Sequence, residues 1–335
     1  MPDVSVVLPT YNRQAQLKQV LAGLEKQSYP LADFEVIVVS DGSTDGTNDY
    51  LDTFAQQTLL NVKVVIQQNQ GPAAARNHGI QSAQGTIVLF IDDDVVPVPQ
   101  LIEAHIETHQ QYDHDVVVMG PMLTPTEFNM KPWVRWEQAM LDKQYAGMAE
   151  TAWKTDARRF YTGNASLARC HLLRAKGFDT AFRRSEDVEL AYRLAEEGIE
   201  FVFNPEAIGY HYAERSFASW LQTPYAYGRN DVICARDKGH RWLLTAIGSE
   251  YHSRHSFVRW LARLCISRDM ANTVAIATLR QVAEVGSRLG LEWVPQRAYS
   301  GIFNLRHYQG VTDELGGRQQ FFHLVEQTDK SAHPA

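Results

Sequence analysis

The sequence is poor in cysteine, with only three among its 335 residues. Cys170, Cys234 and Cys265 lie far apart and form no C-x-x-C pair. We therefore expect neither a disulfide framework nor a zinc site. So few cysteines, none of them paired, are typical of proteins that work in a reducing compartment.

Two kinds of apolar segment are also missing. The opening MPDVSVVLPTYNR has no basic region followed by a long apolar run, so we expect no signal peptide. No uninterrupted apolar stretch reaches the roughly 18 residues that a membrane span requires. These absences predict a cytoplasmic protein.

A surplus of basic residues is absent as well, because the formal net charge is −7. A general nucleic-acid-binding protein would carry such a surplus, so we expect no nucleic-acid partner. Hydrophobic residues make up 44% of the chain and charged residues 21%. This composition is enough for a sizeable core and argues against global disorder.

Apolar runs alternate with amphipathic segments through about the first 120 residues. We expect strands at residues 4–8, 34–39, 62–66, 86–91 and 116–119. Because these runs are continuous, they indicate strands buried on both faces of a mostly parallel sheet that helices cover.

The remaining segments set the predicted domain organisation. We expect further strands at residues 163–167 and 199–203, an irregular segment at 133–160, and only helices beyond residue 212. The sequence thus predicts an α/β domain at residues 1–212 and a mainly helical region at residues 213–335.

Polar residues gather where four of the predicted strands end. They occupy positions 10–12, 41–42, 69–71 and 92–94. In sheets of this kind ligands bind outside the carboxyl ends of the strands, so we expect the functional site at this edge.

Asp92, Asp93 and Asp94 form the most charged of these clusters. On an extended chain, residues two apart point to the same side, so Asp92 and Asp94 are expected to face one site while Asp93 points elsewhere. Such carboxylates bind Mg²⁺ or Mn²⁺ together with substrate phosphates. The alternative is a solvated acidic loop that complements the dipole of the following helix.

Three other clusters have both a functional and a structural interpretation. Gly71 permits close approach of a ligand to a helix N-terminus, and Arg76 can either reach a phosphate or remain solvated. Glu186 and Asp187 either complement a helix dipole or supply a catalytic base. His211 is either structural or, if it lies near the aspartates, a metal ligand.

Taken together, these clusters resemble family 2 glycosyltransferases, which have the Rossmann-like GT-A fold. The segments that carry the resemblance are VSVVLPTYNR, VVSDGSTDGT, GPAAARN, FIDDD, and GFD followed by SEDVEL. They occur in the family's order over about residues 4–212. The resemblance implies a catalytic domain at residues 1–212 that binds a nucleotide-sugar.

The resemblance also implies how the nucleotide is held. Pro9, Tyr11 and Asp41 would hold the base and ribose, with Asp41 accepting a hydrogen bond from the base. Gly71 and Arg76 would support the nucleotide. UDP is the default expectation, and GDP and dTDP remain open.

Asp92, Asp93 and Asp94 would continue this cofactor-binding set. Asp92 and Asp94 would form the family's DXD pair, which touches the ribose and the metal-bridged diphosphate. Asp94, Asp92 and His211 would be the ligands of a Mn²⁺ or Mg²⁺ ion.

On the acceptor side, Asp187 would be the general base and Glu186 would position the acceptor, while Gly163 and Asn164 would line the donor sugar. In-line attack would invert the anomeric configuration. The resemblance implies transfer to a glycan or a lipid-linked acceptor, in the synthesis of bacterial cell-surface glycans or glycolipids. The alternatives are a non-catalytic nucleotide-sugar or carbohydrate-binding module and a nucleotidyltransferase.

The segment from Arg254 to Arg297 is the one basic region. It has seven arginines and three acidic residues, a local excess of four positive charges. Its apolar stripe belongs either to a core-facing helix or to a surface that rests on anionic lipid. The stripe consists of Phe257, Trp260, Leu261, Leu264 and Cys265. The second interpretation predicts peripheral contact with the inner face of the plasma membrane through residues 254–297.

Overall fold

The computed structural model describes residues 2–332, which divide into two units. The α/β unit comprises the described residues up to Asn129 together with Gln138–Ala213. The helical unit comprises Met130–Glu137 and the described residues from Glu214 onward. Each unit has its own buried core.

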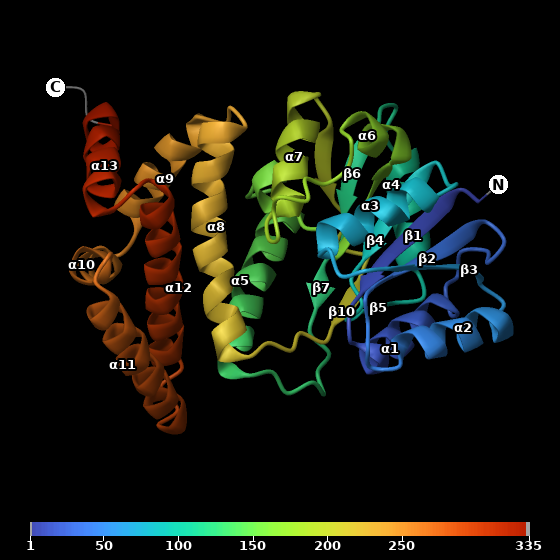
Figure 1. Ribbon diagram of the computed structural model, residues 1–335, viewed down its shortest axis with the longest axis horizontal. Helices are drawn as coiled ribbons and strands as arrows, with labels where there is room; N and C mark the ends of the chain where they lie inside the picture. Colours follow the sequence, from blue (N-terminus) through green and yellow to red (C-terminus); the bar gives the residue numbers. More distant parts are fainter. Residues whose placement is uncertain (1, 333–335) are drawn as a thin grey trace. The chain divides into compact units, whose positions relative to one another are not determined.

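The α/β unit is built on a seven-stranded sheet with the order β3-β2-β1-β4-β8-β6-β9 (Figure 1). The strands are β1 (Val4–Thr10), β2 (Phe34–Asp41), β3 (Asn61–Gln67), β4 (Ile87–Ile91), β6 (Val116–Met119), β8 (Asn164–Ala168) and β9 (Glu200–Phe203). Only β8 pairs antiparallel with its neighbours in this sheet. The expected α/β fold with a mostly parallel sheet is confirmed.

Helices cover this sheet because their apolar positions recur at helical spacing. They are α1 (Gln14–Leu24), α2 (Thr47–Gln57), α3 (Pro72–Ser82), α4 (Leu101–Gln110), η1 (Ala157–Arg159), α6 (Arg169–Arg174) and α7 (Glu186–Glu196). In α1, Leu17, Leu21 and Leu24 are fully buried in one cluster with residues of β1, β2 and β4. Each such side chain contributes roughly 1.5–3 kcal/mol to folding.

The strand order places a reversal of direction at the centre of the sheet. The chain runs outward from β1 to β3 and then returns to form β4 on the other side of β1. Ligands of open α/β sheets bind outside the carboxyl ends of the strands at such a reversal. The residues that follow β1 and β4 therefore lie at the expected binding crevice.

A small second sheet was not predicted from the sequence. Its order is β5-β10-β7, formed by β5 (Val95–Pro97), β10 (Gly209–His211) and β7 (Met122–Leu123). These strands have two or three residues, too few for a periodic pattern. Their pairing brings His211 opposite Val95, directly after the aspartates.

The expectation of an irregular segment at residues 133–160 was wrong over its first half. Helix α5 spans Pro132–Ala149. Proline is well suited to the first helical position, and the Glu, Gln, Ala, Met, Leu and Lys residues that follow are good helix formers. Interspersed aromatic residues obscured this pattern.

The helical unit contains the helices that the sequence predicted beyond residue 212. They are α8 (Phe217–Asp237), α9 (Trp242–Ser253), α10 (Ser256–Cys265), α11 (Asp269–Arg288), α12 (Trp293–Glu314) and α13 (Arg318–Ala332). Trp220 is fully buried and packs edge-on against the rings of Trp136 and Tyr299. No helix within residues 2–332 is long and apolar enough to cross a membrane.

Candidate functional site

The three aspartates after β4 do not alternate along an extended chain. The Val95 amide donates to the Asp92 carbonyl over 3.0 Å, which closes a turn. The Arg13 Nη1 atom lies 3.0 Å from Asp93 Oδ1 and 2.6 Å from Asp94 Oδ2. The expectation that Asp93 points away from Asp94 was therefore wrong, because the turn directs both carboxylates to Arg13.

Burial and Arg13 act on these carboxylates in opposite directions. Burial raises the pKa of Asp93 to about 6, although Arg13 acts to lower it. Burial also acts to raise the pKa of Asp94, but His211 and Arg13 outweigh it and hold this pKa well below its ordinary value. Asp94 is therefore a carboxylate at neutral pH.

Sequence reasoning missed Arg13. It follows β1, which is the neighbour of β4 in the sheet, so its position at the carboxyl end of a central strand was the available signal. Burial acts to lower the pKa of Arg13, but the aspartates raise it above its ordinary value. The guanidinium therefore stays charged.

His211 lies beside Asp94, as the sequence suggested it would if it were a ligand. The pairing of β10 with β5 places its Nε2 atom 3.6 Å from Asp94 Oδ1. The other ring nitrogen, Nδ1, is buried without a hydrogen-bond partner. The Tyr212 amide donates to the Asp94 carbonyl over 2.9 Å, which fixes the two chain segments together.

Arg76 joins the aspartates to the start of α7. Its Nη2 atom lies 2.8 Å from Asp92 Oδ1, and its Nη1 atom lies 2.8 Å from Glu186 Oε1. Arg76 is buried, so it is not the solvated residue of the structural interpretation. Arg76 and Glu186 are 110 positions apart in the chain, so this bridge brings distant segments to one place.

Asp187 is partly buried in the first turn of α7. Burial raises its pKa to about 7, and the charge of the neighbouring Glu186 adds to this rise, while Arg76 opposes it. The Val188 amide donates to Asp187 Oδ1 over 2.8 Å. A carboxylate with this pKa is half protonated near neutral pH, which suits a general base.

The Asp41 carboxylate organises the loop after β3. Its Oδ1 atom accepts from Gln67 Nε2 at 2.7 Å and from the Gln70 amide at 2.8 Å, and its Oδ2 atom accepts from the Gly71 amide at 2.9 Å. A carboxylate has about four acceptor sites, so one remains on Oδ2. Gly71 adopts a φ of +94° that other residues rarely take, and a Cβ there would meet no atom within 4 Å.

The remaining predicted residues differ in how open they are. Pro9 is partly buried in β1, whereas the Tyr11 ring at the end of that strand is 48% exposed. Gly163 accepts a hydrogen bond from the Asp92 amide over 3.3 Å, and a Cβ at Gly163 would lie 3.0 Å from Asp92 Oδ2.

The Asn164 side chain is fully buried. Its Oδ1 atom lies 2.9 Å from His105 Nε2, and its Nδ2 atom donates to the carbonyls of Pro121 and Ala207. This side chain holds the core together and does not face a cavity that a sugar can enter.

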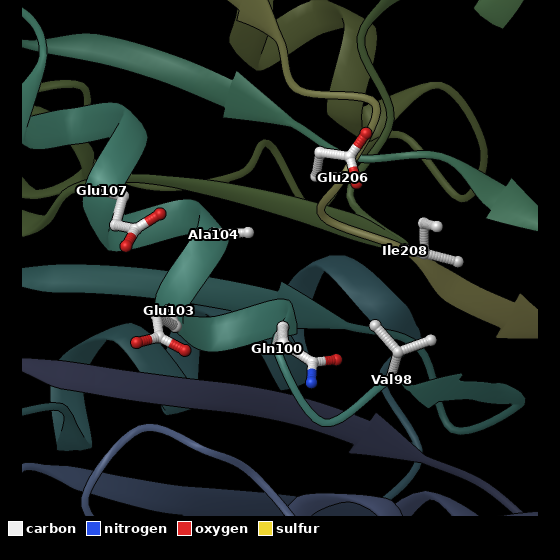
Figure 2. Close-up of a pocket in the computed structure, with 7 residues that line it drawn as sticks. All are labelled: Val98, Gln100, Glu103, Ala104, Glu107, Glu206 and Ile208. Atoms are coloured by element: carbon white, nitrogen blue, oxygen red, sulfur yellow. The ribbon is translucent and has the colours of Figure 1, made fainter.

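A pocket of about 530 Å³ lies elsewhere in the α/β unit (Figure 2). Glu103 and Glu107 of α4 line it together with Glu206, Val98 and Ile208. None of the predicted site residues lines this pocket, and Glu103 already accepts a hydrogen bond from Ser28 over 2.6 Å.

This chain belongs to glycosyl transferase family 2, whose family model matches residues 5–175. Validoxylamine A glucosyltransferase of Streptomyces hygroscopicus subsp. jinggangensis is 32% identical over 234 residues. That match covers 62% of this chain and 55% of the relative, so the chain spans about half the length of this curated relative.

Solved structures share the fold, which is GT-A. The mannosyltransferase PcManGT from Pyrobaculum calidifontis, in complex with GDP-Man and Mn²⁺, superposes with a TM-score of 0.65 at 20% identity, covering 94% of this chain and 87% of that chain. S. aureus TarS in complex with UDP-GlcNAc superposes with a TM-score of 0.55 at 17% identity, covering 95% and 93%.

Proposed function

We propose that this glycosyltransferase moves a sugar from a nucleoside diphosphate sugar to an acceptor hydroxyl, with inversion at the anomeric carbon. The observation that carries the proposal is the Arg76 bridge, which joins Asp92 to Glu186 beside Asp187. It gathers acids from distant parts of the chain at the carboxyl end of the sheet. The nucleotide-sugars bound by structural neighbours, GDP-Man and UDP-GlcNAc, support this donor class.

The donor nucleotide would lie across the ends of β1, β2 and β3. The exposed Tyr11 ring offers a stacking face for the base, beside Pro9, and the open acceptor site of Asp41 suits a base N–H. Gly71 lets the backbone come close to the nucleotide. UDP is our default donor nucleotide.

The residues around Asp94 fit a divalent cation. The 3.6 Å between Asp94 and His211 is close to the roughly 3 Å that separates adjacent ligands of one octahedral ion. We propose Asp94 and His211 as ligands. Asp92, the third ligand expected from the sequence, contacts Arg76 and would have to turn from it to join them. When bound, Mn²⁺ or Mg²⁺ offsets the negative charge of the departing diphosphate.

Asp187 would take the proton from the acceptor hydroxyl on the opposite side of the sugar. Burial and the charge of Glu186 together raise the pKa of Asp187. The ion pair with Arg76 holds Glu186 in place, where it would position the acceptor. Gly163 packs so closely against Met122 and Asp92 that a side chain there would displace them, and it would line the donor sugar through its backbone. Asn164 would contribute only by fixing the backbone of this segment.

Release of UDP from UDP-sugars in the presence of Mn²⁺ and an acceptor tests this function. Because Asp187 must be deprotonated, kcat/KM is expected to rise with pH through an apparent pKa near 7 and to be lost as the pH falls below it. In Glu186→Gln this rise of kcat/KM should occur at lower pH. The substitution removes a charge that raises the pKa of Asp187, while the amide oxygen can still face Arg76.

Glu103→Gln, on the separate pocket of α4, should leave the profile unchanged. A chain that binds nucleotide-sugars but releases no nucleotide from any UDP, GDP or dTDP sugar would instead be a binding module. If the pH dependence of kcat/KM were the same in Glu186→Gln as in the unchanged protein, Asp187 would not be the base.

The helical unit presents an apolar surface with positive charge around it. Five apolar side chains of α11 and its C-cap form an exposed row at helical spacing, with about two turns between the second and the third. Each is at least 44% exposed: Met270, Val274, Val282, Val285 and Leu289. On the neighbouring α10, Val258, Leu261 and Cys265 are buried, whereas Phe257, Trp260 and Leu264 are exposed. The core-facing interpretation therefore holds for only part of this helix, and the exposed part is available for contact with another surface.

We propose that this surface, residues 254–297, rests on anionic lipid at the cytoplasmic face of a membrane. Its excess of four positive charges complements the lipid, and the exposed row supplies apolar area to bury. Such an attachment would suit a glycan or lipid-linked acceptor, in the synthesis of cell-surface glycans or glycolipids.

The protein is expected to co-sediment with vesicles that contain phosphatidylglycerol, and less so at high salt, because screening weakens the attraction of the arginines. Leu289→Glu should reduce vesicle binding about tenfold or more, since it removes an exposed leucine that the lipid would bury. The matched control is Leu59→Glu, at an 88% exposed leucine of the α/β unit. Equal loss in both variants, or no binding to anionic vesicles, would contradict a lipid surface here.

A further inference from the structure

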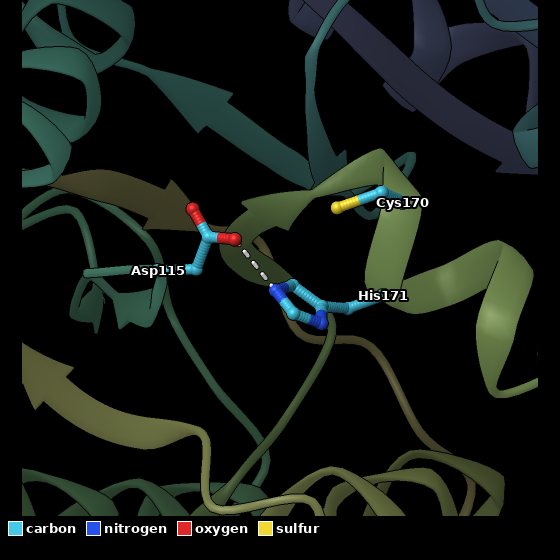
Figure 3. A group of neighbouring side chains, drawn as sticks. All are labelled: Asp115, Cys170 and His171. Carbon is cyan, nitrogen blue, oxygen red and sulfur yellow. Dashed lines mark hydrogen bonds and ion pairs between the residues drawn. The ribbon is translucent and has the colours of Figure 1, made fainter.

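Three side chains of metal-binding type meet in a part of the α/β unit that the proposed transfer does not use (Figure 3). They are Asp115, Cys170 and His171, and one ligand atom of each lies within 4.8 Å of the others. All three point toward one another in Figure 3, from two different chain segments. We propose that they bind one Zn²⁺ ion.

Strand direction explains why these residues meet. Asp115 directly precedes β6, and Cys170 and His171 lie in the first turn of α6, directly after β8. Because β8 runs antiparallel to β6, the residue before β6 and the residues after β8 lie at the same end of these two strands. The opposite end of β8 pairs with Ile91, next to the aspartates. The cluster therefore lies at the end of the strands that is opposite to the proposed transfer site.

His171 is the fixed member of the cluster. Its side chain is buried, and its Nε2 atom lies 2.7 Å from Asp115 Oδ2. Its Nδ1 atom is buried without a hydrogen-bond partner, 4.0 Å from Glu197 Oε2. Zinc-binding histidines commonly direct their second nitrogen to a carboxylate, and Glu197 is already placed to approach.

Asp115 and Cys170 are the adaptable members, since both are exposed. Tetrahedral ligands about 2.0–2.1 Å from zinc lie about 3.3 Å apart. The Asp115 oxygen therefore has to move away from His171 Nε2 by less than about 1 Å. Thiolate, imidazole and carboxylate are the ligands that Zn²⁺ accepts together. Three protein ligands leave a fourth position for water.

Binding exchanges a proton for the ion. The Cys170 thiol releases its proton to solvent and the sulfur bonds to zinc. The proton that His171 Nε2 shares with Asp115 leaves that nitrogen and Nδ1 carries the ring proton, so that Nε2 gives its lone pair to zinc and Nδ1 can donate to Glu197. The ion then links the start of β6 to α6 and replaces the Asp115–His171 hydrogen bond. Its role is to secure this corner of the sheet, independently of sugar transfer.

Titration of the chelator-treated full chain with Co²⁺ tests the site, because a thiolate ligand gives a near-ultraviolet charge-transfer band that oxygen and nitrogen ligands do not. One equivalent of Co²⁺ is expected to produce this band, and Zn²⁺ should abolish it. The candidate ligands Asp94 and His211 supply no sulfur, so metal bound there does not contribute.

Cys170→Ser should lose the band, and Asp115→Asn should weaken Zn²⁺ binding about 10-fold or more. Both residues are exposed, so both variants are expected to fold. Cys234→Ser, at a buried cysteine of the helical unit, is the matched control and should keep the band. Metal that binds without a thiolate band, or a band that survives Cys170→Ser, would show adventitious binding only and overturn the site.

Discussion

Asp187→Asn is expected to lower kcat about 10²–10⁴-fold, the usual contribution of a general base. Asparagine has nearly the same shape but cannot accept the acceptor's proton. Donor binding should survive, because the residues proposed for the nucleotide lie at the ends of other strands. The measurements are kcat from nucleotide release and the affinity for the donor, determined on the same preparation.

The control for this variant is Glu196→Gln, toward the other end of the same helix, which should keep near-normal turnover. Stability separates a chemical from a structural effect. Since burial raises the pKa of Asp187, its charged form is held at a cost, and the neutral amide should leave the melting temperature equal or higher. Near-normal turnover in Asp187→Asn would refute the base assignment.

Asp94→Ala should remove donor binding and metal dependence together, with a loss of at least about 10²–10³-fold in kcat/KM. The carboxylate faces both His211 and Arg13, so its removal leaves the imidazole without its acidic neighbour. Thermal shift with a nucleotide-sugar, with and without Mn²⁺, measures the effect, because a ligand that binds only the folded state raises its stability.

Asp52→Ala, at an exposed aspartate of α2, is the matched control for the loss of one acidic group. It should retain the Mn²⁺-dependent thermal shift. If Asp94→Ala also retained that shift in full, the ion would have to bind without this carboxylate, and the proposed ligand set would fall.

Sequence reasoning was strongest where the physical signal is local. Continuous apolar runs predicted the parallel strands, and polar residues at their ends predicted that Asp41 and Asp92 would follow strands at the same end of the sheet. Helical spacing and the absence of strand patterns predicted the helices beyond residue 212. These signals depend on a few neighbouring residues, which the sequence contains in full.

It was weakest where distant segments decide the outcome. The turn at Asp92 places Asp93 beside Asp94, which an extended chain would not do. Arg13 acquires its partners only when β1 pairs with β4. Asn164 lies at a strand end, as functional residues do, but its side chain turns inward to His105. No spacing rule contains these long-range contacts.

The Arg13 contact has one more consequence, for the order of events during a reaction cycle. The acidic pair is never left as bare repelling charges, since the chain carries its own counterion for it. Under the proposed ligand set, an incoming cation would compete with the guanidinium for the same oxygens. A donor diphosphate would favour the exchange, because it offers the displaced arginine a new anion, and it would so couple metal loading to substrate arrival.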